Sequence, residues 1–112
     1  MKCKCYKPPL FYKDYDITEF GVDITKNRYA EITLEICKHC GTKWIKYLVE
    51  FEAFSQSGRW YRGVINDYTL KKTTTENVVG YLESLEWYMY GGSYFRSTGM
   101  YGHGRLQVDL MG

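Results

Sequence analysis

The sequence is poor in the residues and motifs that catalysis commonly uses. It contains only two histidines, His39 and His103, and none of the usual hydrolase, zinc-protease or phosphate-loop motifs. No run of 18 apolar residues is long enough to span a membrane. Residues 1–9 begin with basic charge but lack the apolar stretch of a secretory signal. We therefore expect a cytoplasmic protein that is not an enzyme.

Four cysteines stand out against this background because they form two close pairs. Cys3 and Cys5 are two residues apart, while Cys37 and Cys40 form a Cys-x-x-Cys pair that Gly41 follows. A glycine there can adopt the positive φ that closes a tight turn and aims two thiolates at one point. In a reducing cytosol such pairs are typical of metal ligands. The sequence thus predicts a structural zinc site made of these four cysteines.

Two alternatives to a four-cysteine zinc site deserve weighing. A redox-active pair is disfavoured, because such pairs sit where a strand leads into a helix, whereas Cys40 is followed by a predicted strand. A site in which His39 replaces one cysteine stays open, since imidazole is an ordinary zinc ligand.

Alternating apolar and polar residues predict a sheet over residues 17–65. Residues 1–16 contain Pro8-Pro9 and are expected to be irregular. The expected strands cover 18–24, 30–36, 44–54 and 59–65. The cysteine turn then lies at the tip of the hairpin between the second and third strands, and the first strand should bury Phe20, Val22 and Ile24.

A single helix is expected over residues 73–90. Thr73 and Glu76 fit a capping box. One helical face would be apolar, formed by Val78, Leu82, Leu85 and Met89. Residues 91–112 form a tail rich in glycine and tyrosine, with a short strand expected over 106–110.

These elements together predict one α+β domain covering residues 1–112. The expected fold is an antiparallel meander of four to five strands, with one helix packed on one face and a zinc knuckle at a hairpin tip. The zinc would pin the N-terminus to that hairpin.

The cysteine turn carries a resemblance to a known motif. Residues 37–44, Cys-Lys-His-Cys-Gly-Thr-Lys-Trp, resemble the second knuckle of a zinc ribbon. This resemblance covers only that hairpin and the N-terminal cysteine pair, and it implies a metal without implying a function. In size and style the rest of the chain resembles the small immunity-type proteins of bacteria, which implies an antitoxin-like role with a protein partner.

Lysines surround the cysteines, and they have two interpretations. In the nucleic-acid alternative the contact residues are Lys2, Lys4, Lys38, Lys43 and Trp44. In the other, the lysines balance the double negative charge of a zinc tetrathiolate. The second is favoured, because zinc and four thiolates together would bring the formal net charge from +2 to zero.

The strand pattern also predicts an acidic face opposite the helix, opposed only by Lys46. It would display Glu19, Asp23, Glu31, Glu35, Glu50 and Glu52. Such a face suits a basic protein partner, although a merely solvated face has the same pattern. The rings of Tyr90, Tyr94 and Tyr101 could add contact area or simply cap the core edge. We expect a non-catalytic module for protein interaction.

Overall fold

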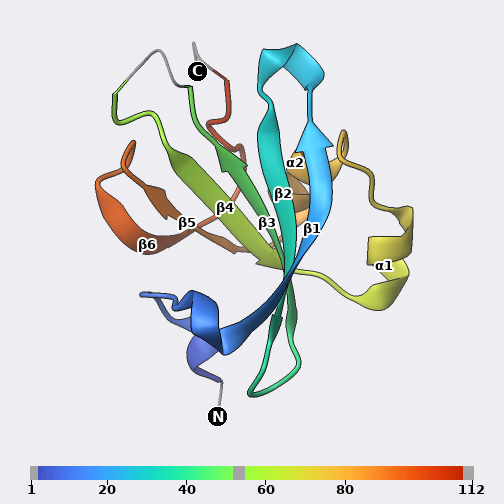
Figure 1. Cartoon of the computed structure of the whole chain (residues 1–112). Coiled ribbons are helices and arrows are strands. Elements are labelled where there is room, and N and C mark those ends of the chain that lie inside the picture. The colour runs from blue at the N-terminus through green and yellow to red at the C-terminus, as the bar shows by residue number, and fades with distance from the viewer. Residues whose placement is uncertain (1–2, 52–54, 110–112) are drawn as a thin grey trace.

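The computed structural model describes residues 3–51 and 55–109. At its centre is a six-stranded antiparallel sheet in which the strands follow chain order (Figure 1). The strands are β1 (Tyr15–Asp23), β2 (Ala30–Cys37), β3 (Lys43–Val49), β4 (Arg59–Val64), β5 (Tyr88–Gly92) and β6 (Ser97–Gly102). The expected α+β meander is therefore confirmed in outline, with six strands in place of four to five.

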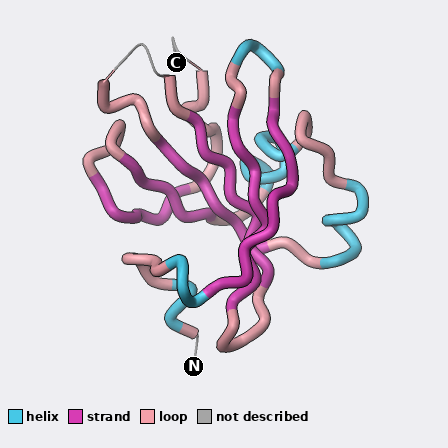
Figure 2. Tube along the Cα trace, viewed as in Figure 1, coloured by secondary structure: helices cyan, strands magenta, loops and turns pink. Residues whose placement is uncertain are grey.

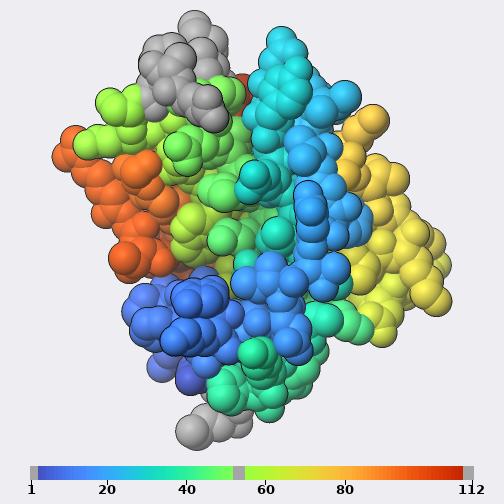
Figure 3. All heavy atoms as spheres, in the orientation of Figure 1, coloured from blue at the N-terminus to red at the C-terminus, as the bar shows by residue number. Residues whose placement is uncertain are grey.

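Short helices lie around the sheet (Figure 2). Two are α-helices, α1 (Asp67–Lys72) and α2 (Val78–Ser84). The others are 3₁₀ turns, η1 (Lys4–Tyr6), η2 (Tyr12–Asp14) and η3 (Thr25–Asn27). We call the sheet face that packs against α2 the inner face and the opposite one the outer face. Residues 3–14, the N-terminal segment, cover the lower part of the outer face (Figure 3).

Alternation in β2 and β3 behaves as the sequence predicts. Ile32, Ile45, Tyr47 and Val49 are fully buried in the inner core beside Leu82 of α2. These strands lie in the middle of the sheet, where one face must be apolar throughout and the period of two is strictly kept.

The first strand departs from its predicted alternation because it contains a β-bulge. Glu19 pairs with Thr33 but Gly21 pairs with Ile32, so the intervening residue, Phe20, is the extra one. A bulge shifts the following residues to the opposite faces. Val22 is therefore 40% exposed and Asp23 is fully buried, the reverse of the expectation, and Ile24 beyond the strand is exposed as well.

The prediction of a single helix over residues 73–90 is wrong, because α1 precedes this range and α2 covers only part of it. Asn66 caps α1 by accepting a hydrogen bond from the Thr69 N–H at 2.8 Å, and Thr73 ends that helix instead of starting a new one. The second helix, α2, stops at Ser84, and Leu85 is already extended. Aromatic residues such as Tyr88 and Tyr90 favour a strand. They form β5 and do not extend the helix.

The apolar spacing that suggested one long helix is shared between two elements. Val78 and Leu82 of α2 are buried in the inner core, and Leu85 packs against the same cluster. Met89 is also fully buried, but it lies on β5 and belongs to the outer core. A spacing of eleven residues fits a helix and equally fits a helix followed by a strand.

The C-terminal segment forms no strand within the described part of the expected range 106–110. Side chains hold it on the sheet instead. The Tyr61 hydroxyl donates to the Gln107 carbonyl and accepts from the Gln107 N–H, both at 3.0 Å. A Glu83 carboxylate oxygen accepts from the Leu106 N–H at 2.9 Å. Backbone groups that lack a strand partner are thus satisfied by side chains.

The sheet has a separate apolar core on each face. The inner core lies under α2 and the C-terminal segment. The outer core consists of Cys5, Tyr15, Cys37, Trp44 and Met89. The N-terminal segment contributes only part of this outer core and contains no α-helix. Hydrogen bonds such as that from the Lys38 N–H to the Asp14 carbonyl at 2.8 Å also attach it.

Asp23 sits in a buried polar cluster at the end of β1. Its carboxylate accepts hydrogen bonds from the Tyr47 hydroxyl at 2.6 Å and from the Thr25 N–H and hydroxyl at 3.0 and 2.6 Å. The Arg28 guanidinium lies 3.6 Å away and pairs with Asp109. Burial alone would raise the pKa of Asp23, but these hydrogen bonds and the Arg28 charge outweigh it and hold that pKa below its usual value.

The depressed pKa of Asp23 predicts loss of stability in acid. Its stabilising contribution is present above about pH 4 and disappears as the pH falls through the folded-state pKa. The Asp23→Asn variant should be less stable at pH 7 by about 1–3 kcal/mol and should lose less stability between pH 5 and pH 3. Urea unfolding at several pH values measures both effects. Asp16→Asn, an exposed change on the same strand, is the control, and equal acid sensitivity of both variants would contradict the assignment.

Candidate metal centre

The turn after β2 places Cys37 and Cys40 side by side. Cys37 is the last residue of β2 and exchanges backbone hydrogen bonds with the far side of the turn: its N–H donates to the Thr42 carbonyl, and its carbonyl accepts from the Gly41 N–H, both at 2.9 Å. Gly41 has a φ of +77°, a conformation that glycine adopts without a steric penalty. The predicted knuckle geometry is therefore present.

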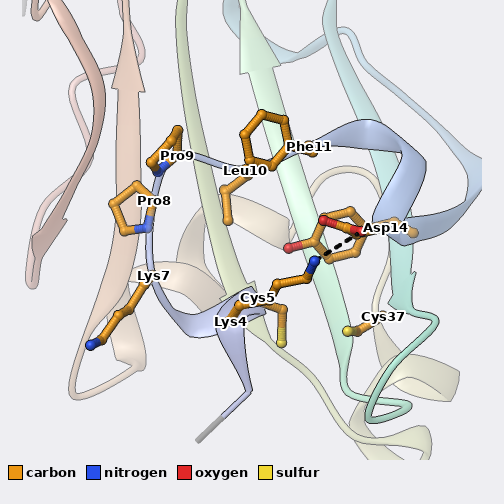
Figure 4. Close-up of a pocket in the computed structure, with 10 residues that line it drawn as sticks. Lys4, Cys5, Lys7, Pro8, Pro9, Leu10, Phe11, Asp14 and Cys37 are labelled. Carbon is orange, nitrogen blue, oxygen red and sulfur yellow. Dashed lines mark ion pairs between the residues drawn. The ribbon is translucent and has the colours of Figure 1, made fainter.

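The N-terminal pair is carried by the turn η1. The Tyr6 N–H donates to the Cys3 carbonyl at 3.1 Å, which closes one tight turn around Cys5. Cys5 is 2% exposed and packs in the outer core. Figure 4 shows its sulfur and that of Cys37 facing a common space, although one comes from the N-terminal segment and the other from the end of β2.

The four sulfurs lie within 4.8 Å of one another. The Sγ atoms of Cys3 and Cys37 are 3.6 Å apart, as are those of Cys5 and Cys40. A disulfide would need about 2.05 Å. Four thiolates around a tetrahedral ion at about 2.3 Å lie about 3.8 Å from each other. The distances fit four separate sulfurs around one metal ion, and all four cysteines are free.

The environment of the sulfurs differs from one side of the cluster to the other. Burial raises the pKa of the Cys5 thiol well above its usual value, and the indole N–H of Trp44 opposes this rise. At the exposed side, the Thr42 hydroxyl lies 3.1 Å from the Cys40 sulfur and lowers the pKa of Cys40 to about 6. Four adjacent thiolates repel each other, so a bound cation is what allows all of them to be deprotonated together.

An aromatic platform supports the sulfur cluster. Tyr6 meets Trp44 edge-on with ring centroids 5.0 Å apart, and Trp87 lies 6.1 Å from Trp44. Trp44 is fully buried, and its Nε1 makes no hydrogen bond of standard geometry with the described residues. The same N–H nevertheless lowers the pKa of Cys5 and so favours its thiolate form. Contacts of this kind, made by residues that do not bind the metal themselves, adjust the basicity of metal ligands.

His39 does not belong to the sulfur cluster. Its Nε2 lies 3.1 Å from an Asp14 carboxylate oxygen, which also pairs with Lys4 at 3.4 Å (Figure 4 shows the Lys4 pair). Hydrogen bonding by His39, aided by the charge of Lys4, holds the pKa of Asp14 below its usual value. With four sulfurs already grouped, the alternative in which His39 replaces a cysteine gains no support.

The predicted acidic face is much reduced in the structure. Glu31 and Glu50 are exposed, as is Glu19. Glu35, however, is only 6% exposed and pairs with Arg62 at 3.3 Å, and Asp23 is buried in its own cluster. Glu52 lies outside the described residues. The expectation was wrong for Asp23 because the bulge in β1 turns its side chain inward. It was wrong for Glu35 because Arg62, which is distant in sequence, pairs with it on the sheet.

The three predicted contact tyrosines lie in different surroundings. Tyr94 is 45% exposed at the β5–β6 turn, with the Arg59 guanidinium 4.3 Å from its ring centroid. Tyr101 is 53% exposed at the opposite end of the sheet, where its hydroxyl donates to the Tyr6 carbonyl. Tyr90 is half-buried against the inner core. The residues therefore do not form one patch.

The nucleic-acid alternative loses most of its predicted residues. Trp44 is fully buried and cannot stack on a base. Lys4 pairs with Asp14, and Lys43 pairs with Asp67. Lys38 is exposed, and Lys2 lies outside the described residues. Among the described residues, Trp44, Lys4 and Lys43 are thus engaged within the fold.

Sequence reasoning missed two residues that shape the site. Thr42 stands two positions after Cys40, so its hydroxyl could have been anticipated as a thiolate donor from the tightness of the turn. Arg62 had no such signal: its buried pairing with Glu35 follows from the register of β2, β3 and β4, which brings distant residues together.

Comparisons with known proteins do not point to a function for this arrangement of cysteines. No family model, no curated protein and no solved structure matches the chain. No helix within the described residues is long and apolar enough to cross a membrane. The function must be argued from the residues themselves.

Removing one sulfur should release the metal and loosen the N-terminal segment. Cys37→Ser is expected to lower the free energy of unfolding by about 3 kcal/mol or more, because the metal closes a long loop between Cys5 and Cys37. For a chain of this size the melting temperature should fall by more than about 10 °C.

The matched control for this substitution is His39→Ala, which alters the same turn but spares the sulfurs. It should retain the metal in elemental analysis and melt within a few degrees of the native protein. An unchanged melting temperature for Cys37→Ser would contradict a structural role for the cluster.

Proposed function

We propose that Cys3, Cys5, Cys37 and Cys40 bind one structural zinc ion. The observation that carries this is the sulfur spacing, 3.6 Å across two pairs that come from opposite ends of a long loop. A set of four thiolates in tetrahedral reach suits zinc or an iron–sulfur centre among the biological metals. Zinc is preferred because one closed knuckle pair on a hairpin is its usual structural setting.

The zinc ion adds to the few hydrogen bonds that attach the N-terminal segment to the rest of the fold. Residues 6–36 separate Cys5 from Cys37, and ordering such a loop costs conformational entropy. Coordination joins η1 to the end of β2 and holds Cys5 over Trp44 and Met89, which completes the outer core. Metal binding and folding of the outer face are thus one event.

The site is not suited to catalysis at the metal. Four sulfur ligands fill a tetrahedral ion, so no position is left for water or substrate. His39 is engaged with Asp14 beside the cluster. We therefore assign the protein a non-catalytic role, in which the zinc supports a binding surface.

The surface that best fits a protein partner lies at the end of the sheet away from the zinc. Glu31 is the second residue of β2, Glu50 follows β3, and Tyr94 lies in the β5–β6 turn. The Tyr94 N–H donates to the Gly58 carbonyl at 2.9 Å, which holds that turn beside the start of β4. Exposed carboxylates at the same end of the sheet as an exposed ring favour a basic protein, as an immunity-like role would require.

Elemental analysis of the purified protein tests the metal. One zinc per chain is expected, with four thiols that react with a thiol reagent only after unfolding or chelation. Metal-free protein with four thiols that react in the native state would overturn the zinc assignment and reopen disulfide or redox interpretations of the cysteines.

Charge reversal tests the partner surface. The double variant Glu31→Lys, Glu50→Lys should lose capture of a basic protein that the native chain retains in a pull-down at low salt, because like charges then face each other. Glu76→Lys, an exposed reversal near α2, is the matched control and should capture normally. Capture that survives the double reversal would show that the interface lies elsewhere.

A further inference from the structure

A cavity of about 350 Å³ opens between the N-terminal segment and the outer face of the sheet. Its aromatic walls come from Phe11, Tyr12, Tyr15 and Trp60. Two of these rings are strongly exposed, Phe11 at 62% and Tyr12 at 72%. Cavities of this size, mostly apolar and holding a few polar groups, are the usual sites of small ligands.

The polar part of the cavity is a buried arginine with incomplete hydrogen bonding. Arg62 is 1% exposed and lies between two rings, with its Cζ 4.7 Å from the Tyr15 centroid and 4.5 Å from the Trp44 centroid. Its Nη1 is 3.3 Å from a Glu35 oxygen. Its Nε and Nη2 have no hydrogen-bond partner among the described residues. Buried donors without a partner are uncommon in folded proteins, and a water, an ion or another polar group commonly satisfies them.

Arg28 shows how the nitrogens that Arg62 leaves unpaired, Nε and Nη2, can bind a carboxylate. Arg28 donates from Nε and Nη2 to the two carboxylate oxygens of Asp109 at 2.6 and 3.0 Å. This forked pairing is the preferred match between a guanidinium and a carboxylate. The same two nitrogens are the ones that Arg62 leaves unpaired.

The charges around the cavity favour an anionic guest. Its ionisable lining consists of Glu35, Lys46 and Arg62, which are one anion and two cations. Glu35 already faces both cations, with Lys46 at 3.9 Å. Lys46 is 30% exposed and lies 5.9 Å from the Trp60 ring centroid, so its charge is close to the aromatic wall.

We propose that this cavity binds a small aromatic carboxylate. The carboxylate pairs with Lys46 and Arg62, and the ring packs against Phe11, Tyr12 and Trp60. Binding supplies a partner for the under-satisfied guanidinium and removes exposed rings from water. A cationic molecule of the same shape would be repelled by Lys46 and Arg62, because the only carboxylate of the lining, Glu35, already pairs with both of them.

Benzoate is the probe for the test, and the protein is the full chain after its metal content has been measured. Titration is followed by the indole N–H signals of the three tryptophans in a nitrogen–proton correlation spectrum. Saturable movement of the Trp60 signal is expected, while Trp87, which is not part of the cavity lining, serves as the internal reference. Benzyl alcohol should bind about tenfold more weakly or worse, and benzylamine should leave Trp60 unmoved.

A matched pair of substitutions assigns the charge effect. Lys46→Gln should weaken benzoate binding about tenfold or more, whereas Lys71→Gln on α1 should bind like the native chain. The partly exposed position of Lys46 keeps this test free of the folding defect that a change at buried Arg62 could cause. The proposal is overturned if benzoate does not move Trp60, if benzylamine moves it equally, or if Lys46→Gln binds as tightly as the native chain. Each of these outcomes leaves the zinc assignment untouched.

Discussion

Convergence of four sulfurs is the constraint on which the outer half of the molecule depends. Cys3 and Cys5 reach Cys37 and Cys40 only when the N-terminal segment lies across the sheet, and Cys5 and Cys37 are also members of the outer core. The inner core has helix α2 and the C-terminal segment to cover it. The outer core has only a short irregular segment, so in the proposed zinc site coordination would supply the stability that a helix would otherwise provide.

Attachment through the cysteines also explains where the cavity lies. The segment is fixed to the sheet at η1 and again where it enters β1, and residues 8–12 pass between these two points. Phe11, Tyr12 and Trp60 line the same cavity. If the four cysteines hold a metal as proposed, the attachment that folds the N-terminal segment also shapes the cavity beside Arg62.

Charge on the surface is set by pairing across strands more than by composition. Asp23 and Glu35 are removed from the surface by Arg28 and Arg62, while Asp14 engages Lys4. The remaining exposed carboxylates of the expected acidic face gather toward the end of the sheet away from the cysteines. The proposed contact surface is consequently smaller and more local than a continuous acidic face.

The sequence by itself determined the turn that brings Cys37 and Cys40 together, because a knuckle depends on local spacing and on the freedom of Gly41. It also determined that β2, β3 and β4 are strands, although β3 ends at Val49 and not at residue 54 as expected. It did not determine the bulge at Phe20, since a bulge is defined by the pairing partner on β2. Nor could it divide residues 73–90, because Met89 fits a helical face as well as a strand until β4 is beside it. The pairing of Glu35 with Arg62 likewise came only from tertiary structure, since strand register brings together charges that no short-range pattern connects.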